Sequence, residues 1–487
     1  MARIPAGRWP PSRTPVPGST LPEVWAARWA ARPDAPVLID GWDRTRVVDA
    51  ATLDGRTAAL AAALAERGVS AGDRVLWWSR TTLPAVEALL AVMRSGAVLV
   101  PVSPSATTSE LDHVIGDARP VLALVDREWP DVDAGGPALS HLHVDELSRV
   151  ASHAAPVTLP ARHPEDDALI VYTSGTTGRP KGAVHTHGSL LAGVSALRTA
   201  WAWVPEDRLV LSLPLFHVHG LCAGLFGTLA AGASATLFDR FDGEAVLQAT
   251  PDCSLFFGVP TMYHRLVATG GAAALGVLRL CVSGSAPLAP DLWQVLADEG
   301  VDVLERYGMT ETLLTLSNPL AGERRPGSVG LPLPGVEAAV DEADESGIGE
   351  LLVRGAPLCR GYWGRDAFAA GDWFATGDLV SVADDGYVTI RGRRTELIIT
   401  GGHNVYPAEV EAVLARHPGV VEVAVVGLPS AEWGETVVAY VVGDPDLGSL
   451  QALAAAELAS FKCPREVRQI DALPRNALGK VVRGELR

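Results

Sequence analysis

Short apolar runs alternate regularly with amphipathic segments from about Asp166 onward, and this pattern is compatible with few folds. The runs "ALIVYT", "RLVLSLPL", "CSLFFGV" and "LRLCVSGS" have the composition of buried strands, and helical segments such as "SLLAGVSALRTAW" and "APDLWQVLADEG" follow them. Repeated strand–helix units predict parallel sheets with helices on their faces. Ligands bind at the carboxyl ends of the strands in such sheets, so motifs directly after strands are the candidates for chemistry.

The chain of 487 residues is too long for one ordinary core. Residues 1–20 are rich in Pro and Arg and predict a flexible N-terminal tail. Residues 21–393 predict a large α/β domain of parallel sheets, and the short strands and turns after Glu337 add a β-rich subdomain to it. Residues 394–487 predict a small α+β domain, because helix and strand patterns there form a separate core.

Composition excludes several classes of function. The formal net charge of −17 disfavours non-specific binding to nucleic acids or anionic membranes. The apolar stretch from Val218 to Phe238 is interrupted by glycines, so we interpret it as a buried helix and strand and expect no membrane insertion. The N-terminus lacks the apolar run of a secretory signal, and the five cysteines contain no CxxC pair. We therefore expect reduced thiols and a cytoplasmic location.

The stretch "YTSGTTGRPKGAV", from Tyr172 to Val184, carries glycines, hydroxyls and one lysine directly after an apolar strand. Backbone N–H groups and hydroxyls at close approach are what phosphate oxygens need. Lysine is rare in this chain, since it occurs only at Lys181, Lys462 and Lys480 among 40 Lys and Arg residues. The stretch does not match a Walker A loop, because Pro180 and Gly182 stand at the wrong positions. An ordinary Gly-rich surface turn is the alternative.

The same stretch resembles the phosphate loop of the adenylate-forming superfamily, which includes acyl-CoA synthetases, adenylation domains of peptide synthetases and luciferases. Other motifs that resemble this superfamily follow in its order: "LFHVHG", "GVPTMYHR", "SGSAPL", "ERYGMTET", "WFATGDL", "GYVTIRGR", "TGGHNVYPAEVE" and "LPRNALGK". Several of them together are similar to the malonyl-CoA synthetases.

This resemblance implies that a carboxylate attacks ATP to give acyl-AMP, and that the thiol of coenzyme A then takes the acyl group, with Mg²⁺ and a small mobile C-terminal domain. It implies catalytic roles for Lys480, Lys181, Thr310 and Glu311, with Glu311 and Thr173 also near the metal. It implies that the phosphates are bound by Thr173, Ser174, Gly175, Thr176, Thr177, Gly178 and Lys181. The adenine cleft is expected at Ser285, Ala286, Pro287, Glu305, Arg306, Tyr307, Gly308, Met309 and Thr310, the ribose contacts at Asp378 and Arg393, and the pantetheine tunnel at Gly401 and Gly402.

The resemblance also points to a short acid with a second carboxylate, malonate or methylmalonate. The residues expected to bind it are Arg265, His217, His219, Ser285 and Met309. An arginine suits a carboxylate because its planar fork donates two hydrogen bonds. An exposed Arg265 on an amphipathic helix is the alternative, which would favour a longer or aromatic acid.

The hinge departs from the superfamily pattern, because it reads Arg393-Arg394-Thr395-Glu396. A carrier-protein thiol or an amine therefore stays open as the acceptor in place of coenzyme A. A nucleotide-binding protein without catalysis is a further alternative, which the presence of Lys181, Glu311, Asp378, Arg393 and Lys480 disfavours.

Overall fold

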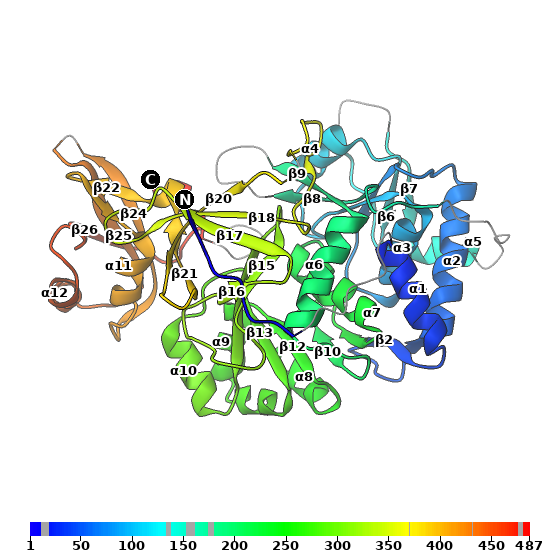
Figure 1. Ribbon diagram of the computed structural model, residues 1–487, viewed down its shortest axis with the longest axis horizontal. Helices are drawn as coiled ribbons and strands as arrows, with labels where there is room; N and C mark the ends of the chain where they lie inside the picture. The colour runs from blue at the N-terminus through cyan, green and yellow to red at the C-terminus, as the bar shows by residue number, and fades with distance from the viewer. Residues whose placement is uncertain are drawn as a thin grey trace. The chain divides into compact units, whose positions relative to one another are not determined.

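The computed structural model describes residues 1–10, 19–132, 138–151, 161–173, 180–369, 371–430, 432–475 and 481–487. The chain divides into two compact units. The larger unit comprises Pro5–Glu337 and Arg354–Asp372, and the smaller unit comprises Met1–Ile4, Ala338–Val353 and Trp373–Arg487. Figure 1 shows their helices and strands and labels many of them.

The first sheet of the larger unit has seven strands in the order β19-β9-β8-β5-β4-β6-β7. Strands β8, β5, β4, β6 and β7 run parallel, whereas β9 and β19 pair antiparallel at one edge. In sheet order the bounds are β19 Gly361–Tyr362, β9 Lys181–Thr186, β8 Asp167–Thr173, β5 Val98–Pro101, β4 Arg74–Trp78, β6 Leu122–Val125 and β7 His141–His143.

The second sheet of this unit has nine strands in the order β16-β15-β14-β13-β12-β10-β11-β2-β3. The strands from β14 to β2 are parallel, and β16, β15 and β3 are antiparallel at the edges. In sheet order the bounds are β16 Leu331–Pro332, β15 Leu313–Ser317, β14 Val303–Met309, β13 Leu280–Ser283, β12 Leu255–Gly258, β10 Arg208–Leu211, β11 Ser234–Leu237, β2 Pro36–Asp40 and β3 Val47–Asp49.

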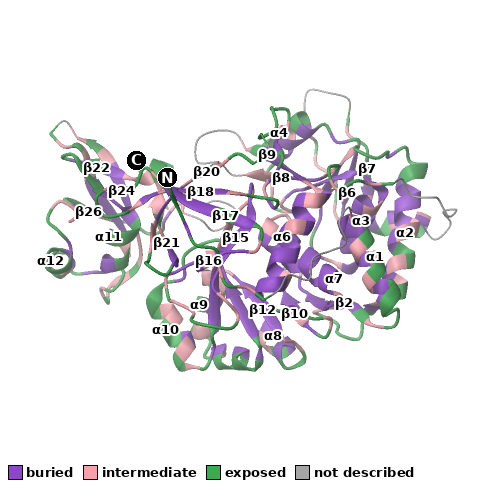
Figure 2. Ribbon diagram, in the orientation of Figure 1, coloured by how far each residue is buried: buried purple, intermediate pink, exposed green. Residues whose placement is uncertain are grey.

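Helices connect and cover these strands. Their bounds are α1 Leu21–Ala31, α2 Ala50–Glu66, α3 Leu83–Ser95, α4 Thr108–Ala118, α5 Val144–Ala151, α6 His187–Ala200, a π-helix His219–Phe226, α7 Gly227–Ala231, α8 Gly243–Ala249, α9 Pro260–Ala268 and α10 Pro290–Asp298. One continuous apolar core joins both sheets, because buried side chains of α1, α2, α3 and α6 belong to the same cluster as Trp77 in β4 and Leu209 in β10. Figure 2 colours the buried residues of the chain purple. Each large side chain buried there stabilises the fold by about 2 kcal/mol.

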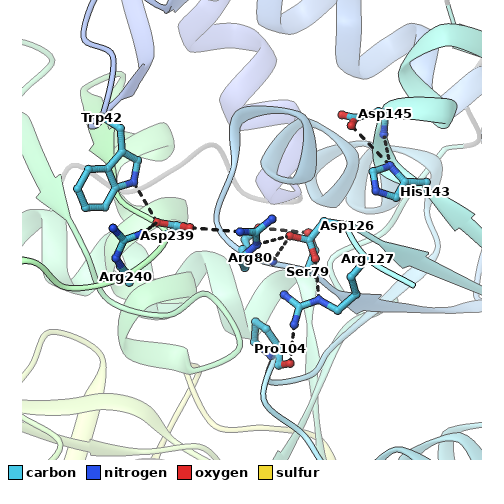
Figure 3. Close-up of polar contacts among 10 residues, drawn as sticks. All are labelled: Trp42, Ser79, Arg80, Pro104, Asp126, Arg127, His143, Asp145, Asp239 and Arg240. Atoms are coloured by element: carbon cyan, nitrogen blue, oxygen red, sulfur yellow. Dashed lines mark hydrogen bonds and ion pairs between the residues drawn. The ribbon is translucent and has the colours of Figure 1, made fainter. Parts of the chain in front are cut away.

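An ion-pair network joins the carboxyl-end loops of the two sheets (Figure 3). Arg80 follows β4, and its guanidinium lies 2.7 Å from Asp126 and 3.9 Å from Asp239, which follows β11. Asp239 also accepts a hydrogen bond of 2.9 Å from the indole of Trp42. Burial alone would raise the pKa of Asp126, but hydrogen bonds from Arg80 and Arg127 outweigh it and lower that pKa. These charges neutralise one another, so we assign the network to holding the sheets together.

The smaller unit contains two sheets. The first has the order β1-β17-β18-β20-β21, with bounds β1 Ala2–Arg3, β17 Val336–Asp341, β18 Gly349–Gly355, β20 Phe374–Val382 and β21 Val388–Arg393. The second is β22 Ile398–Thr400, β23 His403–Val405, β24 Val420–Ser430, β25 Gly434–Gly443 and β26 Glu466–Gln469, with helices α11 Pro407–Leu414 and α12 Leu447–Glu457. Val410 of α11, Val425 of β24 and Leu450 of α12 share a separate apolar core.

The α/β class with parallel sheets is confirmed, and the predicted buried helix and strand within 218–238 are the π-helix, α7 and β11. Within the described part of the chain, no helix is long and apolar enough to cross a bilayer. The first residues of the chain, where the sequence predicts a flexible tail, are ordered in the structure. Ala2 and Arg3 pair with β17, and Ile4 is buried. Residues 11–18 of that tail lie outside the described residues, and a domain boundary at 393/394 stays a prediction.

Candidate active site

A hairpin presents the two ends of the expected phosphate loop. Thr173 ends β8, Lys181 begins β9, and the two residues are cross-strand partners. The Thr173 hydroxyl donates to the backbone carbonyl of Lys181 at 3.4 Å, and the Lys181 side chain is exposed. The loop residues Ser174, Gly175, Thr176, Thr177 and Gly178 lie outside the described residues. The hairpin thus brings the lysine and the threonine at the loop's ends together at the carboxyl end of β8.

Helix α4 anchors this hairpin. The imidazole Nε2 of His113 lies 2.8 Å from the carbonyl oxygen of Pro180, just before β9. The hydroxyl of Tyr172, in β8, donates to the carboxylate of Asp117 at 2.6 Å. Both strands flanking the loop are therefore held to the same helix.

Glu311 lies in the turn that connects β14 to β15, and its side chain is buried. The phenol of Tyr362 donates a hydrogen bond of 2.8 Å to Glu311 Oε1. The ammonium of Lys181 lies 5.5 Å from the centroid of the Tyr362 ring. Burial, with the charge of Glu311, raises the pKa of Tyr362, so the phenol stays a donor at neutral pH. Tyr362 thus links two residues that the sequence placed in the phosphate and metal site.

The donor chemistry at this position fits a hard cation. Glu311 supplies a carboxylate and Thr173 a hydroxyl, and Mg²⁺ prefers oxygen ligands of this kind. Tyr362 was not among the residues predicted from the sequence. Its motif, "GYWG", could equally belong to a packing aromatic, and only its pairing with β9 reveals its place.

A second group of predicted residues meets at the carboxyl ends of β13 and β14. The Ser285 hydroxyl, after β13, lies 3.5 Å from Nδ1 of His219 in the π-helix. Nη2 of Arg306, in β14, donates to the same hydroxyl at 3.4 Å. The ring of His219 stacks on Phe257 at 6.2 Å between centroids. Ser285 is exposed, so this cluster of His219, Ser285 and Arg306 borders solvent.

The backbone around Ser285 is shaped to admit Arg306. Ser285 has φ +71°, in the left-handed region that non-glycine residues rarely occupy. A Cβ atom on Gly284 would come within 2.3 Å of the guanidinium carbon of Arg306. Glycine is therefore required at this position if the guanidinium is to lie against the strand end.

The cluster holds a buried positive charge. Arg306 is only 5% exposed, and burial lowers its pKa to about 9, so the guanidinium remains mostly charged at neutral pH. Among the described residues, no carboxylate pairs with Arg306, and its Nε has no hydrogen-bond partner. Burial lowers the pKa of His217 to about 4, and burial with the charge of Arg306 holds the pKa of His219 well below its usual value. Both imidazoles are neutral at pH 7, so they neither repel a bound cation nor neutralise the charge of a bound anion.

The other residues predicted for the pocket differ in their exposure. Arg265 is exposed on α9, and His217 and Met309 are half-buried. Ala286 and Pro287 are exposed, whereas Gly308 and Thr310 are half-buried. The Tyr307 hydroxyl lies 3.9 Å from Met309 Sδ. Glu305 accepts backbone hydrogen bonds from Gly327 and Leu288, and the bond to Leu288 orders the loop after Ser285. Burial raises the pKa of Glu305 to about 7.

Buried histidines also support the loop that carries Glu311. Nε2 of His185 lies 2.7 Å from the carbonyl oxygen of Thr310, and Nδ1 lies 3.2 Å from the hydroxyl of Ser189. Burial lowers the pKa of His185 to about 4. Since the backbone carbonyl can only accept, the neutral imidazole donates through Nε2 and holds Thr310 in place.

Acid is expected to lower the free energy of unfolding of the larger unit, because buried neutral histidines become protonated when the chain unfolds. His187 is the histidine best suited to measure this effect. Burial lowers its folded pKa from 6.5 to about 4, so between these values the unfolded chain binds more protons. The stability is therefore complete above pH 6.5 and is lost as the pH falls toward 4. At pH 4.5 the loss from one such histidine is about 2 kcal/mol.

Urea unfolding of wild type and His187→Leu at pH 7.5 and 4.5 measures this loss. Neither imidazole nitrogen of His187 has a partner among the described side chains, so leucine leaves no group unpaired. We expect the variant to lose less stability on acidification than the wild type. Equal losses in both proteins would show that His187 titrates normally.

The other candidates lie in the smaller unit. Asp378, in β20, is 4% exposed, and its carboxylate lies 2.7 Å from Nε of Arg393 in β21. Gly401 and Gly402 are exposed, with φ +56° and +79°, and a Cβ on Gly401 would meet the Trp433 ring at 2.9 Å. Lys480 lies outside the described residues. The structure thus brings together Asp378 and Arg393, the two residues predicted to contact the ribose.

Comparison with known families adds a separate line of support. Residues 25–363 match the AMP-binding enzyme family, and residues 409–480 match the AMP-binding enzyme C-terminal domain. Two solved structures align over nearly the whole chain. ATP-bound MatB from Rhodopseudomonas palustris is 35% identical, with a TM-score of 0.90, covering 96% of this chain and 98% of that one. An o-succinylbenzoate CoA synthetase from Bacillus subtilis with its acyl-adenylate is 28% identical, with a TM-score of 0.87, covering 97% and 99%.

Curated relatives differ in their acids. A malonate–CoA ligase from Arabidopsis thaliana is 34% identical, over 85% of this chain and 78% of the relative. A feruloyl-CoA synthase from Amycolatopsis is 36% identical, over 90% and 93%, and a sulfoacetate–CoA ligase from Cupriavidus necator is 34% identical, over 96% and 97%. The resemblance found in the sequence motifs is confirmed: the chain belongs to the AMP-binding enzyme family of the adenylate-forming superfamily.

Proposed function

We propose that this protein is an AMP-forming acyl-CoA synthetase that activates a short acid carrying a second anionic group, with malonate or methylmalonate first. Its other reactants are ATP and coenzyme A, and its cofactor is Mg²⁺. The observation that carries the substrate assignment is the buried Arg306, which meets Ser285 and has no carboxylate partner among the described residues.

A buried guanidinium without a counter-ion is costly, because burial removes the water that would solvate its charge. A substrate anion in the His219, Ser285 and Arg306 cluster would neutralise that charge. The guanidinium fork can donate to both oxygens of a carboxylate, and the serine hydroxyl can donate as well. An acid without a second anionic group would leave the charge buried and unpaired, so it should be a poor substrate.

The acids named for the relatives are of two kinds. Malonate and sulfoacetate both carry a second anionic group, whereas ferulate carries none at that end. Arg306 supports the first kind of acid for this chain. A longer or aromatic acid remains the alternative substrate, and the exposed position of Arg265 on α9 favours it only if Arg306 has no role in binding.

The first half-reaction joins the acid's carboxylate oxygen to the α-phosphorus of ATP and releases pyrophosphate. Lys181 and the loop after Thr173 would hold the phosphates, and Asp378 with Arg393 would bind the ribose hydroxyls. Mg²⁺, held by Glu311 and by phosphate oxygens, would supply charge neutralisation during this transfer. Lys480 would bridge the acid and the α-phosphate, a role that rests on its motif alone.

The second half-reaction passes the acyl group to the thiol of coenzyme A and releases AMP. We assign the approach of the thiol to the loop of Gly401 and Gly402, since both glycines are exposed and have positive φ. Residues 394–487 would act as the mobile domain that carries this loop and Lys480. A carrier-protein thiol or an amine is the alternative acceptor, which the departure at Thr395 motivates. The five cysteines are free thiols, which supports a cytoplasmic location.

Pyrophosphate release with Mg·ATP tests the function. The acids compared are butyrate, octanoate, malonate, methylmalonate, sulfoacetate and ferulate, each with and without coenzyme A. We expect kcat/KM for malonate to exceed that for butyrate by about a hundredfold or more. Coenzyme A should accelerate release and yield the thioester, identified by mass. A preference for octanoate or ferulate would overturn the substrate assignment, and release without a thioester would indicate a different acceptor.

A further inference from the structure

We propose that Tyr362 is a positioning residue that sets the orientation of Glu311 and of Lys181 for a magnesium nucleotide. This inference rests on the proposed function, because it takes Glu311 as the carboxylate for Mg²⁺ and Lys181 as the cation for the phosphates. Tyr362 itself contacts neither reacting atom of the acid nor the α-phosphorus in this assignment. It acts through the two side chains that it touches.

Backbone hydrogen bonds fix the place of Tyr362. The segment that contains it pairs antiparallel with β9, with Tyr362 opposite Ala183. On one side Trp363 N–H donates to the Gly182 carbonyl at 2.8 Å, and on the other Cys359 N–H donates to the Glu311 carbonyl at 2.7 Å. The same short segment is therefore bonded to the strand that begins with Lys181 and to the backbone of Glu311.

The hydroxyl orients the carboxylate. Tyr362 donates to Oε1 of Glu311 at 2.8 Å, and a hydrogen bond to a charged acceptor is stronger than one between neutral groups. This bond selects one rotation of the carboxylate, since it engages one oxygen only. Within the described ranges no hydrogen bond to the second oxygen, Oε2, is found, so that oxygen can bind a cation.

The aromatic ring orients the lysine. The Lys181 ammonium lies 5.5 Å from the ring centroid, and a cation–π contact at an exposed site is a weak attraction. Phe368 packs edge-on against the ring at 5.8 Å between centroids, which limits its rotation. A contact of this size guides the ammonium without holding it back from a phosphate, whose full charge attracts it more strongly.

The combined effect is preorganisation. A flexible lysine and a rotatable carboxylate lose conformational freedom when the nucleotide binds, and that loss weakens binding. Tyr362 limits the freedom of both groups beforehand. Its two parts are separable, because phenylalanine removes the hydroxyl and keeps the ring, whereas leucine removes both.

Calorimetric titration of ATP, without any acid, tests the inference through binding. We measure ATP affinity across a Mg²⁺ series and in EDTA for wild type, Tyr362→Phe and Tyr362→Leu. For Tyr362→Phe we expect the half-saturating Mg²⁺ concentration to rise by about tenfold, with unchanged affinity in EDTA. For Tyr362→Leu we expect the same rise and an additional loss of about threefold in EDTA.

Tyr440→Phe is the matched control, because that phenol accepts from Arg468 in the smaller unit and should change neither quantity. Glu311→Gln supplies a second variant, in whose background Tyr362→Phe should add little. An unchanged Mg²⁺ dependence in Tyr362→Phe, or an equal loss in EDTA, would overturn the inference. Failure of the proposed function is distinct, since it appears as a wild type without acid-dependent pyrophosphate release.

Discussion

Replacing Arg306 with methionine is expected to lower kcat/KM for malonate by about a hundred- to a thousandfold, while that for butyrate changes by less than about fivefold. The side chain is buried, so its attraction to a substrate anion is weakly screened by water. Methionine keeps much of the volume and removes the charge and the donors. Initial rates of pyrophosphate release with each acid measure the two ratios.

Two further measurements separate binding from folding. Removal of an unpaired buried charge should leave the thermal midpoint of Arg306→Met equal to or above that of the wild type. Arg265→Met is the matched variant at an exposed arginine, and we expect a smaller loss with malonate because its charge is solvated. Equal losses with malonate and butyrate would show that Arg306 only shapes the pocket. A larger loss in Arg265→Met would assign the second anionic group to α9.

Glu311→Gln is expected to lower acid-dependent pyrophosphate release by at least about a hundredfold at saturating Mg²⁺. Glutamine keeps the shape and can still accept from Tyr362, but it lacks the negative charge that holds a divalent cation. Thioester formation from supplied acyl-AMP and coenzyme A should be nearly unchanged, because no pyrophosphate leaves in that step. Stopped assays of the two half-reactions measure this difference.

Combining Glu311→Gln with Tyr362→Phe extends this result. If the phenol acts through the carboxylate, the double variant should lose little more than Glu311→Gln alone, since residues that act as a unit are non-additive. Additive losses would give Tyr362 a separate role. Equal loss of both half-reactions in Glu311→Gln would mean that the glutamate supports the fold and not the metal.

The sequence was sufficient for the family and for most of the parallel architecture. Buried parallel strands are near-continuous apolar runs, and the helices between them have a period of about 3.6 residues. Both patterns lie within short stretches of the chain, so they can be recognised in the sequence. The motifs after the strands identified the chemistry for the same reason, because a loop that binds phosphate needs glycines and hydroxyls close together in the chain. The pairing of Ala2 and Arg3 with β17 was not predicted, because it joins residues that are more than three hundred positions apart in the sequence.

The amino-acid sequence was therefore enough to predict the fold class, the phosphate-loop motif and the candidate side chains around it. The three-dimensional structure was needed to show that Arg306 is buried beside Ser285 whereas Arg265 is exposed, since both arginines lie within recognisable motifs. It also brought Tyr362 between Lys181 and Glu311, from three separate parts of the chain. Burial and charge pairing depend on which strands become neighbours, and the pairing of strands that are far apart in the chain leaves no periodic signal in the local sequence.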